Sequence, residues 1–133
     1  MDYDKTFHFV NKTKNNTIAA QGWIAFNALQ RMRGLLGYEN LDKGQGLLLK
    51  PGSSIHMQGM KFPLDIIFVD KSMNVVKVVE DLKPEPRWKL WKMIFGGWKA
   101  HACLELPVGT IQETQTEVGD IIHFYENIEK LSG

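Results

Sequence analysis

Two side chains that can carry acid/base chemistry, His56 and Asp65, stand on either side of segment 60–63. A tight turn at 60–63 would fold them towards each other, and a carboxylate that orients an imidazole forms an acid/base pair. The same hydrogen bond is also an ordinary structural contact, which is the commoner case. The residues therefore leave two interpretations open: a structural pair, or a small enzyme in which His56 is the acid/base and Asp65 orients it.

Three potential metal ligands, His101, Cys103 and Glu105, alternate along segment 100–106. Because successive side chains of a strand point to opposite faces, these three would share one face. They would span about 13 Å, so at most two would reach one ion without a bulge. We therefore expect no stoichiometric bound zinc. The sequence also lacks glycine-rich phosphate and dinucleotide motifs and a Cys-x-x-Cys pair, so we expect no cofactor.

Two arginines, Arg31 and Arg33, occur in a segment with helical periodicity. They would lie about 200° apart on a helix, so only one can face its apolar side. That arginine would either pair with Glu105 or Asp65 or hold a ligand anion, and the ion pair is the commoner arrangement. In the enzyme interpretation, Arg33 or Arg87 would hold a substrate anion. The candidate ligand-binding residues are His56, Asp65, Arg33, Arg87 and Glu105.

The most unusual stretch is segment 83–99, which we call the basic aromatic loop. It holds three of the four tryptophans, with five cations and one anion for a net charge of +4. Tryptophan and lysine favour the headgroups of an anionic membrane, and aromatic rings stack on single-stranded nucleic-acid bases. Alternatively, the rings fold down as a lid over one end of a barrel. Gly96 and Gly97 offer a hinge beside the rings, so a lid and an interface need not exclude each other. The candidate interaction surface comprises Arg87, Trp88, Lys89, Trp91, Lys92 and Trp98.

The elements that must position these residues are mostly strands. Apolar, β-branched segments between turn residues predict strands at 6–10, 17–25, 46–49, 54–57, 64–69, 75–79, 100–106 and 120–125. Polar residues at 11–16 and 70–74 predict two hairpins, and leucine and methionine spacing predicts one amphipathic helix at 28–36. A brief helical turn also fits 111–116. The pattern favours a mainly β fold, a compact antiparallel β-barrel or sandwich with one short α-helix near the N-terminal third. The predicted core includes Ile66, Phe68, Val76, Val78, Leu104, Leu106 and Ile122.

Length and composition indicate a single domain, 1–133, with 44% hydrophobic and 23% charged residues. The net charge of +1 gives no strong signal for double-stranded nucleic acid. A single cysteine excludes an intrachain disulfide and multi-cysteine zinc motifs. The apolar runs are too short to span a bilayer, and the acidic start carries no signal peptide. We therefore expect a cytoplasmic protein, or an exported one if a signal peptide has been removed.

Five motifs follow one another along the chain: RMRGLLG at 31–37, GLL at 46–48, IHMQGMKFPLDIIFVD at 55–70, LELPVGT at 104–110 and VGD at 118–120. This series resembles Domain of Unknown Function family 192 (DUF192) over residues 17–125. His56, Asp65 and Glu105 stand within the motifs, whereas His101 and Cys103 depart from the family pattern. The resemblance implies one β-rich barrel or sandwich domain and no established activity.

Taken together, the residues favour a non-catalytic binding or interaction module that uses the basic aromatic loop beside the His56 and Asp65 motif. Its partner would be an anionic membrane surface, a protein or a small anionic ligand. The alternative is a small enzyme with His56 and Asp65 acid/base chemistry on an anionic small molecule. Discriminating between them requires knowing whether these side chains meet in an open pocket.

Overall fold

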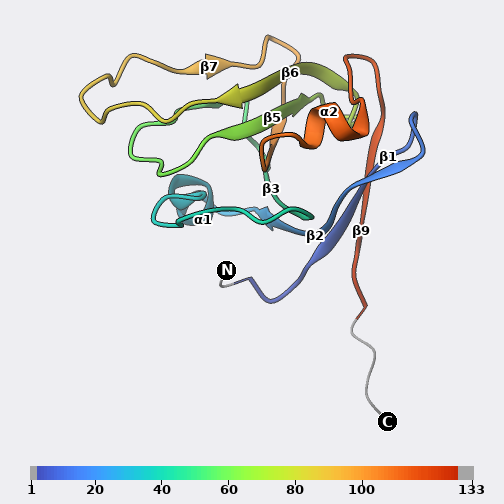
Figure 1. Cartoon of the computed structure of the whole chain (residues 1–133). Coiled ribbons are helices and arrows are strands. Elements are labelled where there is room, and N and C mark those ends of the chain that lie inside the picture. The colour runs from blue at the N-terminus through green and yellow to red at the C-terminus, as the bar shows by residue number, and fades with distance from the viewer. Residues whose placement is uncertain (1–2, 129–133) are drawn as a thin grey trace.

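The computed structural model describes residues 3–128 of the chain (Figure 1). Over these residues it contains nine strands and two short helices. In chain order they are β1 (Phe7–Asn11), β2 (Asn16–Ala25), α1 (Ala28–Arg33), β3 (Gln45–Leu49), β4 (Ser54–Ile55), β5 (Leu64–Val69), β6 (Val75–Leu82), β7 (Ile94–Phe95), β8 (Ala102–Leu106), α2 (Thr110–Thr114) and β9 (Ile122–Glu126). The mainly β fold predicted from the sequence is confirmed, with α2 as a second short helix.

Seven strands form one sheet in the order β6-β5-β8-β3-β2-β1-β9, and β4 pairs separately with β7. Both expected hairpins are present, because β1 pairs antiparallel with β2 and β5 with β6. One pair departs from the antiparallel expectation: β2 and β3 run parallel, with Trp23 opposite Leu47. Parallel neighbours need a crossover connection of a dozen or so residues, and the segment that contains α1 supplies it.

The large sheet carries an apolar cluster on each of its two faces. The first cluster includes Phe9, Leu48, Ile67, Leu104, Leu106, Ile111 and Ile122. The second includes Trp23, Leu35, Leu47, Ile55, Met57, Ile66 and Phe68. Alternate residues of β5 and β8 face opposite clusters, so both strands are buried at every position. This double burial explains the nearly continuous apolar run of β5.

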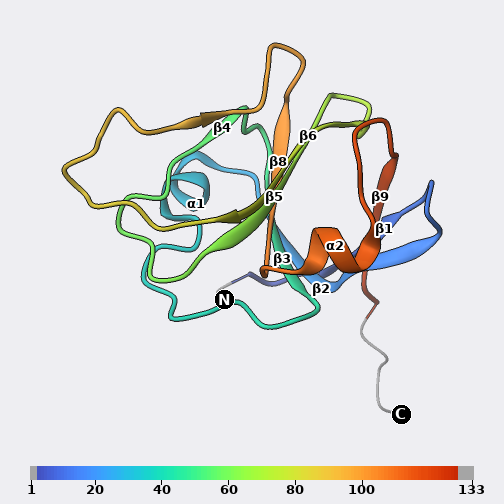
Figure 2. The same cartoon turned by 45° about the horizontal axis from the view of Figure 1, so that its top comes forward.

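The sheet curls into a half-barrel because its edge strands, β6 and β9, approach each other at one end. The N–H of Val75 donates to the carbonyl of Asp120 at 2.8 Å, and the N–H of Ile122 donates to the carbonyl of Met73 at 2.9 Å. Figure 2 shows α2 within the curl, where Ile111 joins the first cluster. The second cluster lies on the other face, beneath the segments that contain α1, β4 and β7.

Helix α1 is shorter and less buried than the sequence predicts. It ends at Arg33, before Gly34 with a φ of +49°, instead of continuing to residue 36. Leu29 and Met32 are exposed, whereas Leu35, just past the helix, is buried in the second cluster. The apolar spacing thus continues beyond the end of the helix, and it is the part after the helix, at Leu35, that reaches the core.

Five of the seven predicted core residues are buried, namely Ile66, Phe68, Leu104, Leu106 and Ile122. Val76 and Val78 are only half-buried. They belong to β6, which is an edge strand of the sheet and has a neighbouring strand on one side only. Alternation along a strand identifies a face, but the position of the strand in the sheet decides how completely that face is covered.

Candidate functional site

Glu105 is the most unusual buried side chain of the sheet. β8 places it opposite Leu47 of β3 and Ile66 of β5, on the face of the second cluster. It is 4% exposed, and its Oε2 atom has no hydrogen-bond partner among the described residues. Burial raises the pKa of the Glu105 carboxyl from 4.5 to about 8, because apolar surroundings disfavour the charged form. At neutral pH the carboxyl is therefore mostly protonated.

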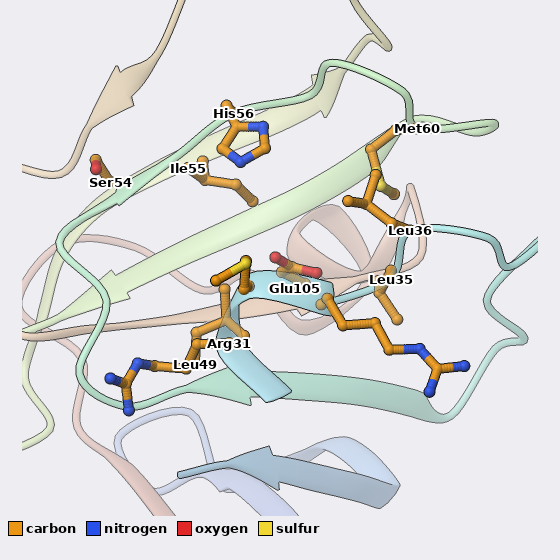
Figure 3. Close-up of a pocket in the computed structure, with 12 residues that line it drawn as sticks. Arg31, Leu35, Leu36, Leu49, Ser54, Ile55, His56, Met60 and Glu105 are labelled. Carbon is orange, nitrogen blue, oxygen red and sulfur yellow. The ribbon is translucent and has the colours of Figure 1, made fainter. Parts of the chain in front are cut away.

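Glu105 lies in a pocket of about 90 Å³ formed by the end of α1, the end of β3 and the segment after β4 (Figure 3). The apolar lining includes Leu35, Leu36, Leu49, Ile55 and Met60. His56 is exposed and lies across the pocket from Glu105 in Figure 3. Drug-sized ligands need pockets of roughly 300 Å³ or more, whereas one water needs only about 15 Å³. The pocket therefore suits one small polar group or the end of a longer chain.

The two arginines that line this pocket have their guanidinium groups engaged with other parts of the protein. Nη1 of Arg31 donates to the backbone carbonyl of Phe26. The guanidinium of Arg33 lies 5.8 Å from the centre of the Tyr38 ring. Among residues 3–128, neither arginine forms an ion pair with Glu105, so the ion pair expected there is absent. Burial alone accounts for the raised pKa of that carboxyl.

Asp65 lies on the other face of the sheet and has a structural role. Its carboxylate accepts hydrogen bonds from the backbone N–H of Asp81 at 2.9 Å and from those of Gly109 and Ile111 at 3.0 Å. Asp65 therefore holds the start of α2 against β5, and it forms no contact with His56. The pleat of β5 turns Asp65 towards the first cluster, while His56 lines the pocket on the opposite face. The acid/base pair of the enzyme interpretation thus lacks its geometric basis.

His101, Cys103 and Glu105 do not assemble a metal site. Cys103 and Glu105 share one face of β8, as alternation predicts, but His101 precedes the strand. Within residues 3–128, no group of three histidine, cysteine, aspartate or glutamate side chains is placed to hold a metal ion. Burial, aided by the neighbouring Glu105, raises the pKa of the Cys103 thiol well above its ordinary value, which disfavours the metal-binding thiolate.

The basic aromatic loop is anchored to the domain at several points. Its β7 pairs with β4, and Nε2 of Gln58 donates to the backbone carbonyls of Lys89 and of Lys92, the latter at 2.8 Å. Gly96 packs so closely on Phe68 that an added Cβ would lie 2.3 Å from the ring. Gly96 is therefore a close-packing position, whereas Gly97, the other glycine of the expected hinge, has a φ of +108° and open space around it. Sequence reasoning missed Gln58, because its anchoring role depends on a partner about thirty residues away.

The large apolar side chains of this loop point into solvent. Their exposed fractions range from 44% for Phe95 to 96% for Trp98, and the set comprises Trp88, Leu90, Trp91, Met93, Phe95 and Trp98. The rings form two edge-to-face pairs, Trp88 with Trp91 and Phe95 with Trp98. A lid would bury these rings over the barrel, so their exposure contradicts the lid interpretation.

The cations of the loop lie among these rings. Nζ of Lys89 is 5.4 Å from the centre of the Trp88 ring. Glu85, the single anion of the loop, lies 3.3 Å from Nζ of Lys92 and 3.8 Å from Nζ of Lys89. Arg87 is exposed and lies beside Gly59, and it is not among the residues that line the Glu105 pocket. None of the candidate interaction residues is among those that line that pocket.

Comparison with known proteins identifies relatives of uncharacterised function. The sequence model of the DUF192 family, described as an uncharacterized ACR, matches residues 9–124. A UPF0127 protein of Thermococcus sibiricus is 34% identical over 117 residues, which cover 85% of this chain and 71% of the relative. A UPF0127 protein of Thermococcus kodakarensis is 30% identical over 125 residues, which cover 91% of this chain and 75% of the relative.

Two crystal structures share the fold. A protein of unknown function from Novosphingobium aromaticivorans superposes with a TM-score of 0.74 at 19% identity, covering 89% of this chain and 83% of that one. A protein from Sinorhizobium meliloti, described as a candidate transcription regulator, has a TM-score of 0.75 at 19% identity, with 90% and 92% covered. Within residues 3–128, no helix has the length and apolarity needed to cross a bilayer.

Proposed function

This chain belongs to the DUF192 family, and we propose that its basic aromatic loop binds the headgroup region of an anionic membrane surface. The observation that carries the proposal is the exposure of six large apolar side chains on a segment of net charge +4. Clustered exposed apolar side chains rimmed by polar groups are typical of interaction sites. Tryptophan combined with lysine and arginine is typical of sites that lie at a lipid headgroup layer.

The side-chain types favour lipid over single-stranded nucleic acid. Leu90 and Met93 are exposed among the rings, and their aliphatic chains have no flat surface on which a base can stack. The boundary between lipid headgroups and acyl chains accommodates both aliphatic and aromatic groups. The edge-to-face contact of Trp88 with Trp91 also turns part of each ring towards its neighbour. A lipid surface thus fits the complete set of exposed side chains, whereas bases would fit only the rings.

The loop is organised before it binds. It runs along an outer edge of the molecule beside β6 (Figures 1 and 2). The pairing of β7 with β4 and the Gln58 hydrogen bonds hold its backbone in place. Association then costs less ordering entropy than it would for a disordered basic segment. This supports binding by the folded domain and not by an unfolded tail.

The first test compares Trp91→Ala with the unmodified protein in co-sedimentation with equimolar phosphatidylcholine and phosphatidylglycerol vesicles. If insertion buries on the order of 100 Å² of the Trp91 ring, the variant loses about 2.5 kcal/mol, or roughly 70-fold in vesicle affinity. Tyr125→Ala is the matched control, because Tyr125 is an exposed aromatic residue on β9, outside the loop. The control is expected to bind vesicles like the unmodified protein.

The second test separates the electrostatic contribution. Arg87→Gln is expected to weaken vesicle binding by about 1 kcal/mol, roughly fivefold, whereas Lys71→Gln in the β5–β6 turn leaves it unchanged. Binding should weaken as salt rises, because dissolved ions screen these charges and limit the range of their attraction to about 8 Å at physiological ionic strength. Equal binding to pure phosphatidylcholine vesicles would contradict the proposal. So would binding to oligo(dT) without binding to vesicles, or a Trp91→Ala variant that has a lower melting temperature but normal vesicle affinity.

A further inference from the structure

We propose that the Glu105 pocket binds an alkylammonium group, with the ammonium against the Glu105 carboxylate and the alkyl stem between the aliphatic walls. The inference concerns the face of the sheet beneath α1 and does not depend on membrane binding. Its basis is a carboxyl that is 4% exposed, faces a pocket and leaves Oε2 without a hydrogen-bond partner among residues 3–128. Buried carboxyl groups without a partner are rare in folded proteins, because leaving them unsatisfied is costly.

The surroundings of Glu105 call for a positive donor from outside. The guanidinium of Arg31 is tied to the carbonyl of Phe26, and that of Arg33 lies against the Tyr38 ring. Neither supplies the counter-charge that a carboxylate in this position lacks. An ammonium brings one positive charge and three N–H donors, and it is small enough for a pocket of about 90 Å³.

The walls define the rest of the ligand. Leu36, Ile55 and Met60 line the pocket together with Glu105, so a short alkyl stem would replace solvent there. A carboxylate or phosphate ligand fits poorly beside the buried Glu105 carboxyl, because the guanidinium groups of the two lining arginines are engaged with the Phe26 carbonyl and the Tyr38 ring. The same alkylammonium chemistry occurs in free amines and at the end of a lysine side chain.

Several titratable or charged groups surround the carboxyl. They are Arg31 and Arg33 from the α1 segment, His56 after β4, Cys103 on the same face of β8, and Tyr3 from the N-terminal segment. Burial raises the pKa of the Tyr3 hydroxyl and of the Cys103 thiol, so both stay neutral over the pH range in which Glu105 ionises. Glu105 is therefore the group of this set whose raised pKa, about 8, lies within the pH range of the experiment.

This chemistry predicts a distinctive pH dependence. A carboxyl with a pKa of about 8 must lose its proton to pair with an ammonium, so n-propylammonium binding at pH 7 should release close to one proton per chain. The apparent affinity should rise roughly tenfold from pH 6 to pH 7 and roughly fivefold more to pH 8.

The experiment is an NMR titration of the ¹⁵N-labelled full chain, without vesicles, using n-propylammonium chloride against sodium chloride at equal ionic strength. We expect saturable shifts at amides of β8 and of segment 54–60, and at least a tenfold loss of affinity in Glu105→Gln. Glu80→Gln, which removes an exposed carboxylate of β6, should bind n-propylammonium normally. A parallel titration with Nα-acetyl-lysine amide, which keeps its side-chain ammonium, distinguishes a lysine side chain from a free amine as the natural ligand. Binding of both compounds indicates a lysine side chain, and binding of n-propylammonium alone indicates a small molecule.

Two outcomes would overturn the proposal. The first is the absence of saturable n-propylammonium shifts at pH 8, and the second is binding of sodium propionate at the same amides instead. Both use the unmodified protein, so they do not depend on whether a variant folds. Because vesicles are absent, either outcome would leave the membrane proposal intact, and failure of vesicle binding would leave this one intact.

Discussion

Replacing Glu105 by glutamine is expected to stabilise the folded protein at neutral and alkaline pH. The carboxyl is buried, and Oε2 has no hydrogen-bond partner among the described residues, so its ionised form is poorly solvated in the folded state. In the unfolded chain the same carboxyl is fully hydrated and ionises near its ordinary pKa. Glutamine has nearly the shape of protonated glutamate but never ionises, so it removes this difference between the two states.

The sign follows from the direction of the pKa shift. The folded-state pKa is about 8 and the ordinary value 4.5, so between them the folded state holds a proton that the unfolded state has lost. The free energy of unfolding therefore decreases as pH rises through this window, by about 1.4 kcal/mol per pH unit. Below pH 4.5 both states are protonated and the variant should match the original. The expected gain for Glu105→Gln is roughly 3 kcal/mol at pH 7 and approaches 5 kcal/mol above pH 8.

The assay is urea unfolding at several pH values from 4.5 to 8.5, followed by tryptophan fluorescence. The quantity of interest is the difference in unfolding free energy between Glu105→Gln and the unmodified protein at each pH, because other titrating groups cancel in it. Glu80→Gln provides the control, since it makes the same chemical change at an exposed position of β6 and should alter the unfolding free energy little. A Glu105→Gln difference that stays constant across the range, or that favours the original protein at pH 8, would refute the argument.

Two further predictions concern the two faces of the sheet. Phe68→Ala should lower the free energy of unfolding by about 3 to 5 kcal/mol in the same assay, because this fully buried ring leaves a cavity; a loss under about 1 kcal/mol would contradict its core position. Asp65→Asn should cost about 2 to 3 kcal/mol, because the carboxylate accepts three backbone N–H groups, including those of Gly109 and Ile111 at the start of α2. Binding of vesicles and of n-propylammonium by Asp65→Asn should be normal, and a selective loss of either would show that Asp65 also serves a site.

Local sequence signals determined the strands and the hairpins. The β5–β6 hairpin was predictable because apolar segments flank a polar turn in which Asp70 accepts from the N–H groups of Ser72 and Asn74 at 2.9 Å. The concentration of tryptophan and positive charge in 83–99 was equally visible. These features depend on residues close together in the chain, and short-range interactions suffice to encode them.

Only the tertiary structure decided which side chains meet. β5 and β8 are buried on both faces, so their sequences do not tell which residue faces which layer. Asp65 and Glu105 face opposite sides of the sheet, and Glu105 shares its pocket with His56. The parallel pairing of β2 with β3 and the anchoring of the loop by Gln58 join segments that are distant in sequence. Such contacts form only when the whole sheet assembles, which is why burial of Glu105 and exposure of the loop could not be derived from the sequence.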